Sequence, residues 1–193
     1  MPNPSSHGFR DGRFVLQDRD VAYAGTREGQ RFMTTHQTPG TVIAGSTSFV
    51  ATAPTFMLFQ ADADTNIVLE SIELFLDDDT TPTVPIIIAI AIDNVDRFVS
   101  GGTAILGQNA NADSSEAADA TFQTTESSPI VASAAGAGTR FLKTFELEAT
   151  AGRGINFTPR GGIQIPRTGS ILVYTFSDVA PSWTFGFEWV QEQ

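Results

Sequence analysis

Apolar and polar positions alternate along much of this chain with a period of two, which is typical of β-strands. The clearest case is Pro85–Asp93. Four isoleucines fall on one face of this segment and Ile87, Ala89 and Ala91 on the other. Because both faces are apolar, the pattern predicts a strand buried on both sides. The isoleucine face would fill a core, and the alanine face would pack closely against a second sheet or another subunit.

Three more segments predict strands, namely Arg140–Glu148, Gly169–Phe176 and Pro181–Val190. In the first of them, Phe141, Phe145 and Leu147 are expected to point inward. The last carries four aromatic residues on one parity, which are Trp183, Phe185, Phe187 and Trp189. Such a stripe would serve as a ligand platform if it were exposed, but at strand period it more often belongs to a core. Core is therefore the prediction.

About eight strand signals, evenly spaced and separated by turn residues, predict an all-β fold. The form expected is a single jelly-roll sandwich over residues 41–193. Residues 1–40 show no sustained period, and they are predicted to form an extended N-terminal arm. The arm is more apolar than a solvated tail needs to be, so we expect it to order on another surface. The residues expected at interfaces are Phe9, Phe14, Leu16, Tyr23 and Phe32 in the arm, with Ala89 and Ala91 in the body.

The net charge of −11 is unevenly distributed. Residues 1–40 hold five arginines and four acidic residues, whereas residues 41–193 hold six basic and eighteen acidic residues. Nucleic acid is bound through clustered lysines and arginines, so an acidic body predicts no nucleic-acid partner. The first residues lack the apolar segment of a secretory signal, and no apolar run is long enough to span a bilayer. We therefore expect neither export nor a membrane partner.

Nucleophilic catalysis of the Ser–His–Asp or Cys–His kind needs an imidazole beside the nucleophile. The chain has no cysteine, and its two histidines, His7 and His36, lie in the predicted arm. A histidine-rich metal site on a jelly roll is excluded on the same ground. The sequence thus predicts a protein that is not an enzyme and needs no cofactor.

Carboxylates are the remaining candidates for chemistry. Asp62, Asp64, Asp77 and Asp79 lie in acidic turns and would suit Ca²⁺. They do not follow the spacing of a known calcium loop, so solvated turns are the simpler interpretation. A glycosidase pair would need two carboxylates on one face. Glu70 and Glu73 fall on opposite parities, while Glu146 and Glu148 suit an ordinary solvent-facing strand.

The arm, the strand series PIIIAIAID, RFLKTFELE, GSILVYTF and WTFGFEWV, and the loop DNVDRFVSGGT together resemble single-jelly-roll virion proteins of bacterial viruses. Capsid decoration (cement) proteins and capsid proteins are the members most similar in architecture. The resemblance implies a homotrimer at three-fold positions of the shell, with an arm that reaches a neighbour. It carries no motif that assigns functional residues.

The first expectation is therefore a capsid decoration protein that stabilises a phage head. Its partners would be its own copies and the major capsid protein or another virion protein. Its location would be the virion, assembled in the host cytoplasm. The alternative is a carbohydrate- or receptor-binding jelly roll of a viral fibre or tail, and a carboxylate-based polysaccharide-cleaving enzyme is a third reading. Burial or exposure of Trp183 and Trp189 discriminates between the first two.

Overall fold

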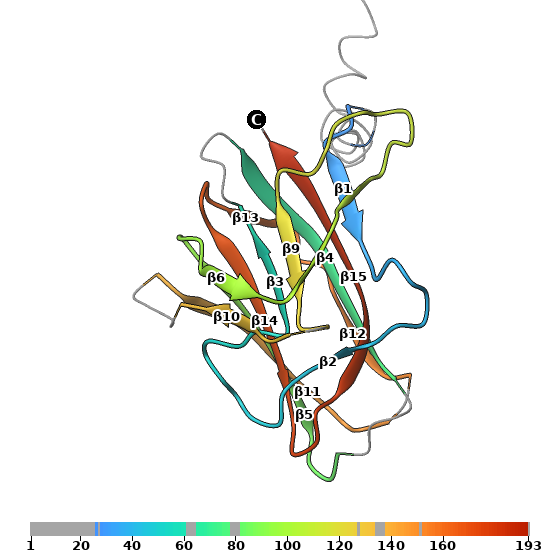
Figure 1. Cartoon of the computed structure of the whole chain (residues 1–193), viewed down its shortest axis with the longest axis vertical. Coiled ribbons are helices and arrows are strands. Elements are labelled where there is room, and N and C mark those ends of the chain that lie inside the picture. Colours follow the sequence, from blue (N-terminus) through green and yellow to red (C-terminus); the bar gives the residue numbers. More distant parts are fainter. Residues whose placement is uncertain are drawn as a thin grey trace, which may run out of the picture.

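The structure is a computed structural model that describes residues 26, 28–60, 65–77, 82–126, 128–133, 138–150 and 152–192. Its strands pair antiparallel in three sheets (Figure 1). The seven-stranded sheet has the order β12 (Gly154–Phe157), β4 (Asn66–Leu76), β15 (Ser182–Glu192), β1 (Arg31–Thr34) and β8 (Gln108–Asn109). In addition, β13 (Ile163–Ile165) pairs with β4, and β2 (Ile43–Ala44) pairs with β15.

The six-stranded sheet has the order β11 (Arg140–Leu147), β5 (Ile86–Asp93), β14 (Ser170–Phe176), β3 (Phe56–Phe59), β9 (Thr121–Thr124) and β7 (Thr103–Ile105). A separate two-stranded sheet joins β6 (Phe98–Gly101) to β10 (Ile130–Ala132). All four strands predicted with a clear pattern are present, as β5, β11, β14 and β15. The all-β class is confirmed.

The inner faces of the two large sheets enclose the main core, so the body is a β-sandwich. Its largest fully buried side chains are Trp183, Trp189, Phe32, Phe56, Phe122 and Phe187. The aromatic stripe of β15 is therefore core, as the sequence predicts. The ring of Trp189 stacks on Phe32 with 6.0 Å between centroids. Trp183 donates its indole N–H to the buried Thr175 hydroxyl at 2.9 Å.

The strand β5 is buried on both faces, as its pattern predicts. Its isoleucines at positions 86, 88, 90 and 92 enter the main core. Ala89 and Ala91 belong to a second apolar cluster together with Tyr174, Ile130 and Ala132. Because Ile130 and Ala132 come from β10, the two-stranded sheet of the same chain packs on the small face. Of the two occupants considered for this face, a second sheet is the one present.

Two β-bulges, one in β11 and one in β4, reverse faces that the period-two pattern assigns. In β11 the register with β5 slips between Phe141 and Lys143. Phe141 therefore lies on the outer side with 52% of its surface exposed, and its predicted inward orientation is wrong. Phe145 and Leu147, beyond the bulge, pack against the main core as predicted. A bulge inserts one unpaired residue, so every later side chain changes face.

The domain begins earlier than predicted. Arg31–Thr34 is strand β1, which lies between β15 and β8 in the large sheet. The predicted boundary at residue 40 thus falls inside the domain. Phe32 was expected at an interface, but it is 1% exposed and lies in the domain's own core, so that expectation is wrong. Its alternation with the exposed Met33 marks it as a strand residue.

Candidate functional site

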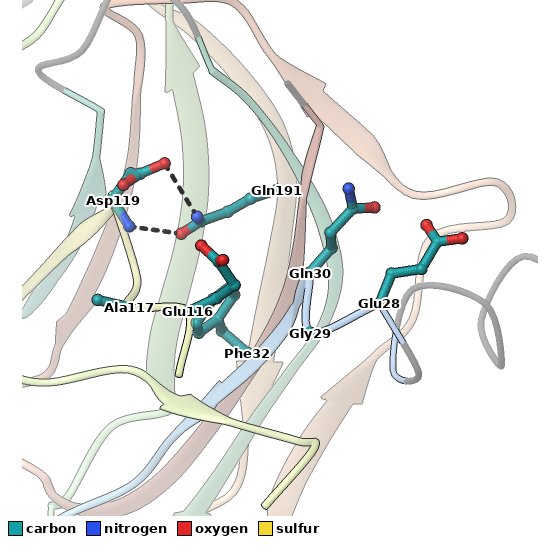
Figure 2. A pocket seen from close by; sticks show the side chains of 8 residues that line it. All are labelled: Glu28, Gly29, Gln30, Phe32, Glu116, Ala117, Asp119 and Gln191. Atoms are coloured by element: carbon teal, nitrogen blue, oxygen red, sulfur yellow. Dashed lines mark hydrogen bonds between the residues drawn. The ribbon is translucent and has the colours of Figure 1, made fainter. Parts of the chain in front are cut away.

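A small acidic pocket lies at the end of the sandwich where the chain enters β1 (Figure 2). It encloses about 140 Å³ and is lined by Glu28, Gly29, Gln30, Phe32, Glu116, Ala117, Asp119 and Gln191. Figure 2 shows Asp119 and Gln191 facing each other across two hydrogen bonds. The Asp119 backbone N–H donates to Gln191 Oε1 at 2.7 Å, and Gln191 Nε2 donates to Asp119 Oδ2 at 3.2 Å.

These bonds give Asp119 a structural task. Its carboxylate also accepts a hydrogen bond from the Thr65 hydroxyl at 3.1 Å. The result is that the segment before β9 is fastened to the last strand and to the start of β4. Among the described residues, no group of three or more histidine, aspartate or glutamate side chains is arranged to hold a metal ion.

Of the candidate calcium ligands, only Asp77 lies within the described residues. Its backbone N–H donates to the Ser182 carbonyl at 2.9 Å, just beyond the end of β4. Asp62, Asp64 and Asp79 lie outside the described residues. The structure therefore does not test whether these four residues lie together, and the calcium site stays a prediction.

A second concavity, here called the sheet groove, lies on the outer face of the seven-stranded sheet. It measures about 280 Å³ and is lined by Met33, Thr34, Thr35, Ser71, Glu73, Gln108, Gly186, Phe187 and Glu188. Gly186 pairs with Glu73, and Glu188 pairs with both Ser71 and Met33. The groove thus crosses β4, β15, β1 and β8. Sequence reasoning did not find it, although a glycine inside the strand signal PSWTFGFEWV was the available sign.

The carboxylates around this groove share a face because β4 also bulges. Its register with β15 slips between Glu188 and Trp189, which leaves Glu70 as the extra residue. Glu70 and Glu73 therefore both lie on the outer face of the sheet. The period-two pattern had placed them on opposite faces, and that prediction is wrong. Glu70 Oε2 pairs with Arg31 Nε at 2.8 Å, and Glu188 Oε2 pairs with Arg31 Nη2 at 2.9 Å. Glu73 accepts a hydrogen bond from Asn156 Nδ2 at 2.7 Å.

An exposed apolar cluster, here called the edge patch, lies on and beside β11, one of the two edge strands of the six-stranded sheet. Phe49 is 45% exposed, Phe141 52% and Leu142 40%. The Phe49 ring contacts the rings of Phe141, Tyr174 and Phe176 at centroid distances between 5.0 and 6.0 Å. Exposed apolar clusters of this kind mark interaction surfaces.

Burial raises the pKa of Tyr174 to about 12, so the phenol beneath the patch stays neutral. The Tyr174 hydroxyl donates to the Ala51 carbonyl at 2.9 Å and holds the segment that carries Phe49. The sequence pattern did not single out Phe49.

The predicted interface residues divide into two groups. Phe9, Phe14, Leu16 and Tyr23 lie outside the described residues. Phe32, Ala89 and Ala91 are within them and at most 6% exposed. Ala89 and Ala91 are covered by the chain's own second apolar cluster, so they are corrected from a subunit interface to an internal one.

Trp183 and Trp189 are both 0% exposed. They therefore offer no platform for stacking a sugar ring, and their exposure would have favoured the carbohydrate-binding alternative. In the part of the chain that the structure describes, no helix has the length and apolar character needed to cross a membrane. No family model, curated protein or solved structure matches this chain.

Proposed function

We propose that this protein is a structural virion protein, a capsid decoration protein that binds the shell of a bacterial virus as a homotrimer and catalyses no reaction. The edge patch is the observation that carries the proposal. Phe49, Phe141 and Leu142 form an exposed apolar surface beside an eight-residue edge strand. A free strand edge offers unpaired backbone groups, and apolar side chains beside it add contact area for a second protein.

We further propose that the sandwich is a jelly roll. Its two last strands each lie inside a sheet, β14 between β5 and β3 and β15 between β4 and β1 (Figure 1). Successive strands also change sheets, from β3 to β4 to β5 and again from β14 to β15. Pairing of late strands with early ones across two sheets supports a jelly-roll wrapping over a simple meander.

The surface proposed for assembly differs from the one that the sequence suggested. Ala89 and Ala91 are buried within the chain, so the trimer cannot form through them. The edge patch takes this role. The acidic body supports a protein partner rather than nucleic acid, because phosphates would be repelled.

The proposal is tested by quantitative mass spectrometry of purified particles of the virus that encodes this chain. We expect the chain in a fixed, high copy number relative to the major capsid protein. Its absence from intact particles, or its presence at only a few copies, would overturn the decoration role. The few-copy result would favour the fibre or tail alternative.

A further inference from the structure

Gly186 lies in the middle of β15, between the core residues Phe185 and Phe187. A glycine inside a strand lowers stability, because it packs no side chain and loses more freedom on folding. The usual structural reasons for such a glycine are absent. Its φ does not lie in the left-handed region, and an added Cβ would meet nothing nearer than 3.8 Å, at Glu73 Oε2. The fold itself therefore does not require glycine at this position.

The missing side chain leaves the floor of the sheet groove open. Met33, which is 42% exposed, stands on one side of this floor and Glu73 on the other. A segment that lies across the groove could approach the backbone of β15 closely, as glycines in strands often permit. Any larger residue at position 186 would occupy the same space.

The charges around the groove are not balanced within the described residues. Glu70 and Glu188 share the single guanidinium of Arg31. Glu73 is bonded to the neutral amide of Asn156, and no salt bridge to it is present in the described part of the chain. The groove therefore suits a positive group on an apolar stem, which describes an arginine side chain.

The chain itself supplies such a segment. Residues 1–25 carry Arg10, Arg13 and Arg19, balanced by three aspartates, and so are not repelled by the acidic body. Within them, Phe9–Phe14 has the sequence FRDGRF, in which each arginine adjoins a phenylalanine. The chain enters β1 at Arg31, the end of that strand away from Thr35 and the groove. The described residues just before β1, Glu28–Gln30, line the acidic pocket and not the groove. With the self-association in the proposed function, this favours the groove of another copy.

We propose that the sheet groove binds the segment Phe9–Phe14 of a second copy of this chain, with an arginine side chain lying over Gly186 and its guanidinium on Glu73. The inference rests on the self-association in the proposed function and adds where and by what chemistry one copy holds the next.

The absence of native cysteines allows a test by disulfide trapping in the full chain. One variant carries Asp11→Cys in the segment and Gln108→Cys at the groove. Its matched control pairs Asp11→Cys with Thr184→Cys, on the same strand and face as Gly186 but outside the groove lining. Under mild oxidation, we expect the first variant to give a ladder of covalent oligomers on a non-reducing gel. The control should give little.

Adding Gly186→Val to the trapping variant should abolish the ladder. The thermal midpoint should be unchanged or higher, because valine favours strands and the site has room for a Cβ. Glu73→Gln should weaken the ladder, whereas Asp113→Asn, in the exposed loop between β8 and β9 and outside the groove lining, should not. An undiminished ladder with Gly186→Val, or an equal ladder from the Thr184→Cys control, would overturn the inference.

The mass of each uncrosslinked sample, measured by light scattering, separates the two proposals. If no ladder forms although the mass is two or more times 20.6 kDa, the binding of the segment in the groove is contradicted and the proposed self-association is not. No ladder from a protein of 20.6 kDa contradicts both. A crosslinked monomer that migrates faster than the reduced chain would mean that the segment occupies its own groove, which also contradicts the proposal.

Discussion

Thr175 is the residue on which several buried polar groups converge. Its hydroxyl accepts the Trp183 indole N–H at 2.9 Å and lies 2.9 Å from the Thr55 hydroxyl. The Thr175 backbone N–H in turn donates to Thr55 Oγ1 at 3.1 Å. All three residues are at most 1% exposed, so water cannot replace a lost partner. This network ties β14 to β15 across the sandwich.

Thr175→Val should therefore lower the free energy of unfolding by about 1–3 kcal/mol, since the shape is kept but a buried N–H loses its acceptor. Urea denaturation followed by tryptophan fluorescence measures the change. In a Trp183→Phe background, where the donor is already gone, the same substitution should cost clearly less. Equal costs in the two backgrounds would show that the hydrogen bond contributes nothing.

His36 links the segment after β1 to Glu126, with 2.8 Å between His36 Nε2 and Glu126 Oε1. Burial lowers the pKa of His36, but the Thr38 carbonyl and Glu126 more than offset it and raise the pKa above its ordinary 6.5. A raised folded-state pKa stabilises the fold below the unfolded value, and this stabilisation is lost as the pH rises through the folded value.

We therefore expect the intact chain to lose some stability between roughly pH 6 and pH 8. A His36→Gln variant should lose less over the same range. Thermal midpoints of both proteins at the two pH values provide the measurement. Parallel pH dependence of the two proteins would assign the effect to other groups.

At the scale of elements, the existence of the strongly patterned strands could be predicted from the sequence, but the faces of β4 and β11 could not. Alternation in β5 and β15 identified the buried residues correctly, including both tryptophans. In β4 and β11, one unpaired residue reverses the faces beyond it. Glu70 and Phe141 were misassigned for this reason. A bulge depends on how two strands pair across the sheet, and a single strand's pattern does not contain that information.

Contacts between segments far apart in the chain also explain why the edge patch and the sheet groove could not be predicted from the sequence. Phe49 lies in a loop, and its contacts with Phe141 and Tyr174 depend on packing between distant segments. The sheet groove likewise needs β1, which counting assigned to an arm because its signal spans only four residues.

The loop after β5 is held by Asp93, whose side chain is fully buried. Asp93 Oδ2 accepts from Arg97 Nε at 2.8 Å and from the Thr139 hydroxyl, and Oδ1 accepts from the Val95 N–H at 3.1 Å. Burial raises the pKa of Asp93, but these bonds outweigh it and leave the pKa below its ordinary value. The resulting stability is present above the unfolded-state pKa and is lost as the pH falls through the folded one.

Asp93→Asn should lower the free energy of unfolding by about 2–4 kcal/mol at neutral pH, because it removes the carboxylate that balances the charge of Arg97. Denaturant titration at neutral and acid pH measures this loss, which should shrink in acid. The matched control is Asp96→Asn in the same loop, which keeps an acceptor for the Phe98 N–H and should cost much less. Equal losses in the two variants would contradict the role given to Asp93.

At the scale of the whole molecule, the body is a sandwich whose core is closed and whose edge remains apolar. The second apolar cluster covers the outer side of β5, yet the outer side of β11 keeps Phe141 and Leu142 exposed. Replacing Phe141 and Leu142 with polar residues should leave the fold intact, because neither belongs to the main core or to the second apolar cluster. Association between copies should weaken.

The central claim is that the chain assembles with itself through the edge patch. The most direct measurement is light scattering across a size-exclusion peak at micromolar concentration. The account predicts a mass of about three times 20.6 kDa for the intact chain. It predicts a clear shift toward 20.6 kDa for Phe49→Ser with Phe141→Ser, but not for the control Leu106→Ser, which is also exposed. A mass of 20.6 kDa for the intact chain would contradict the account.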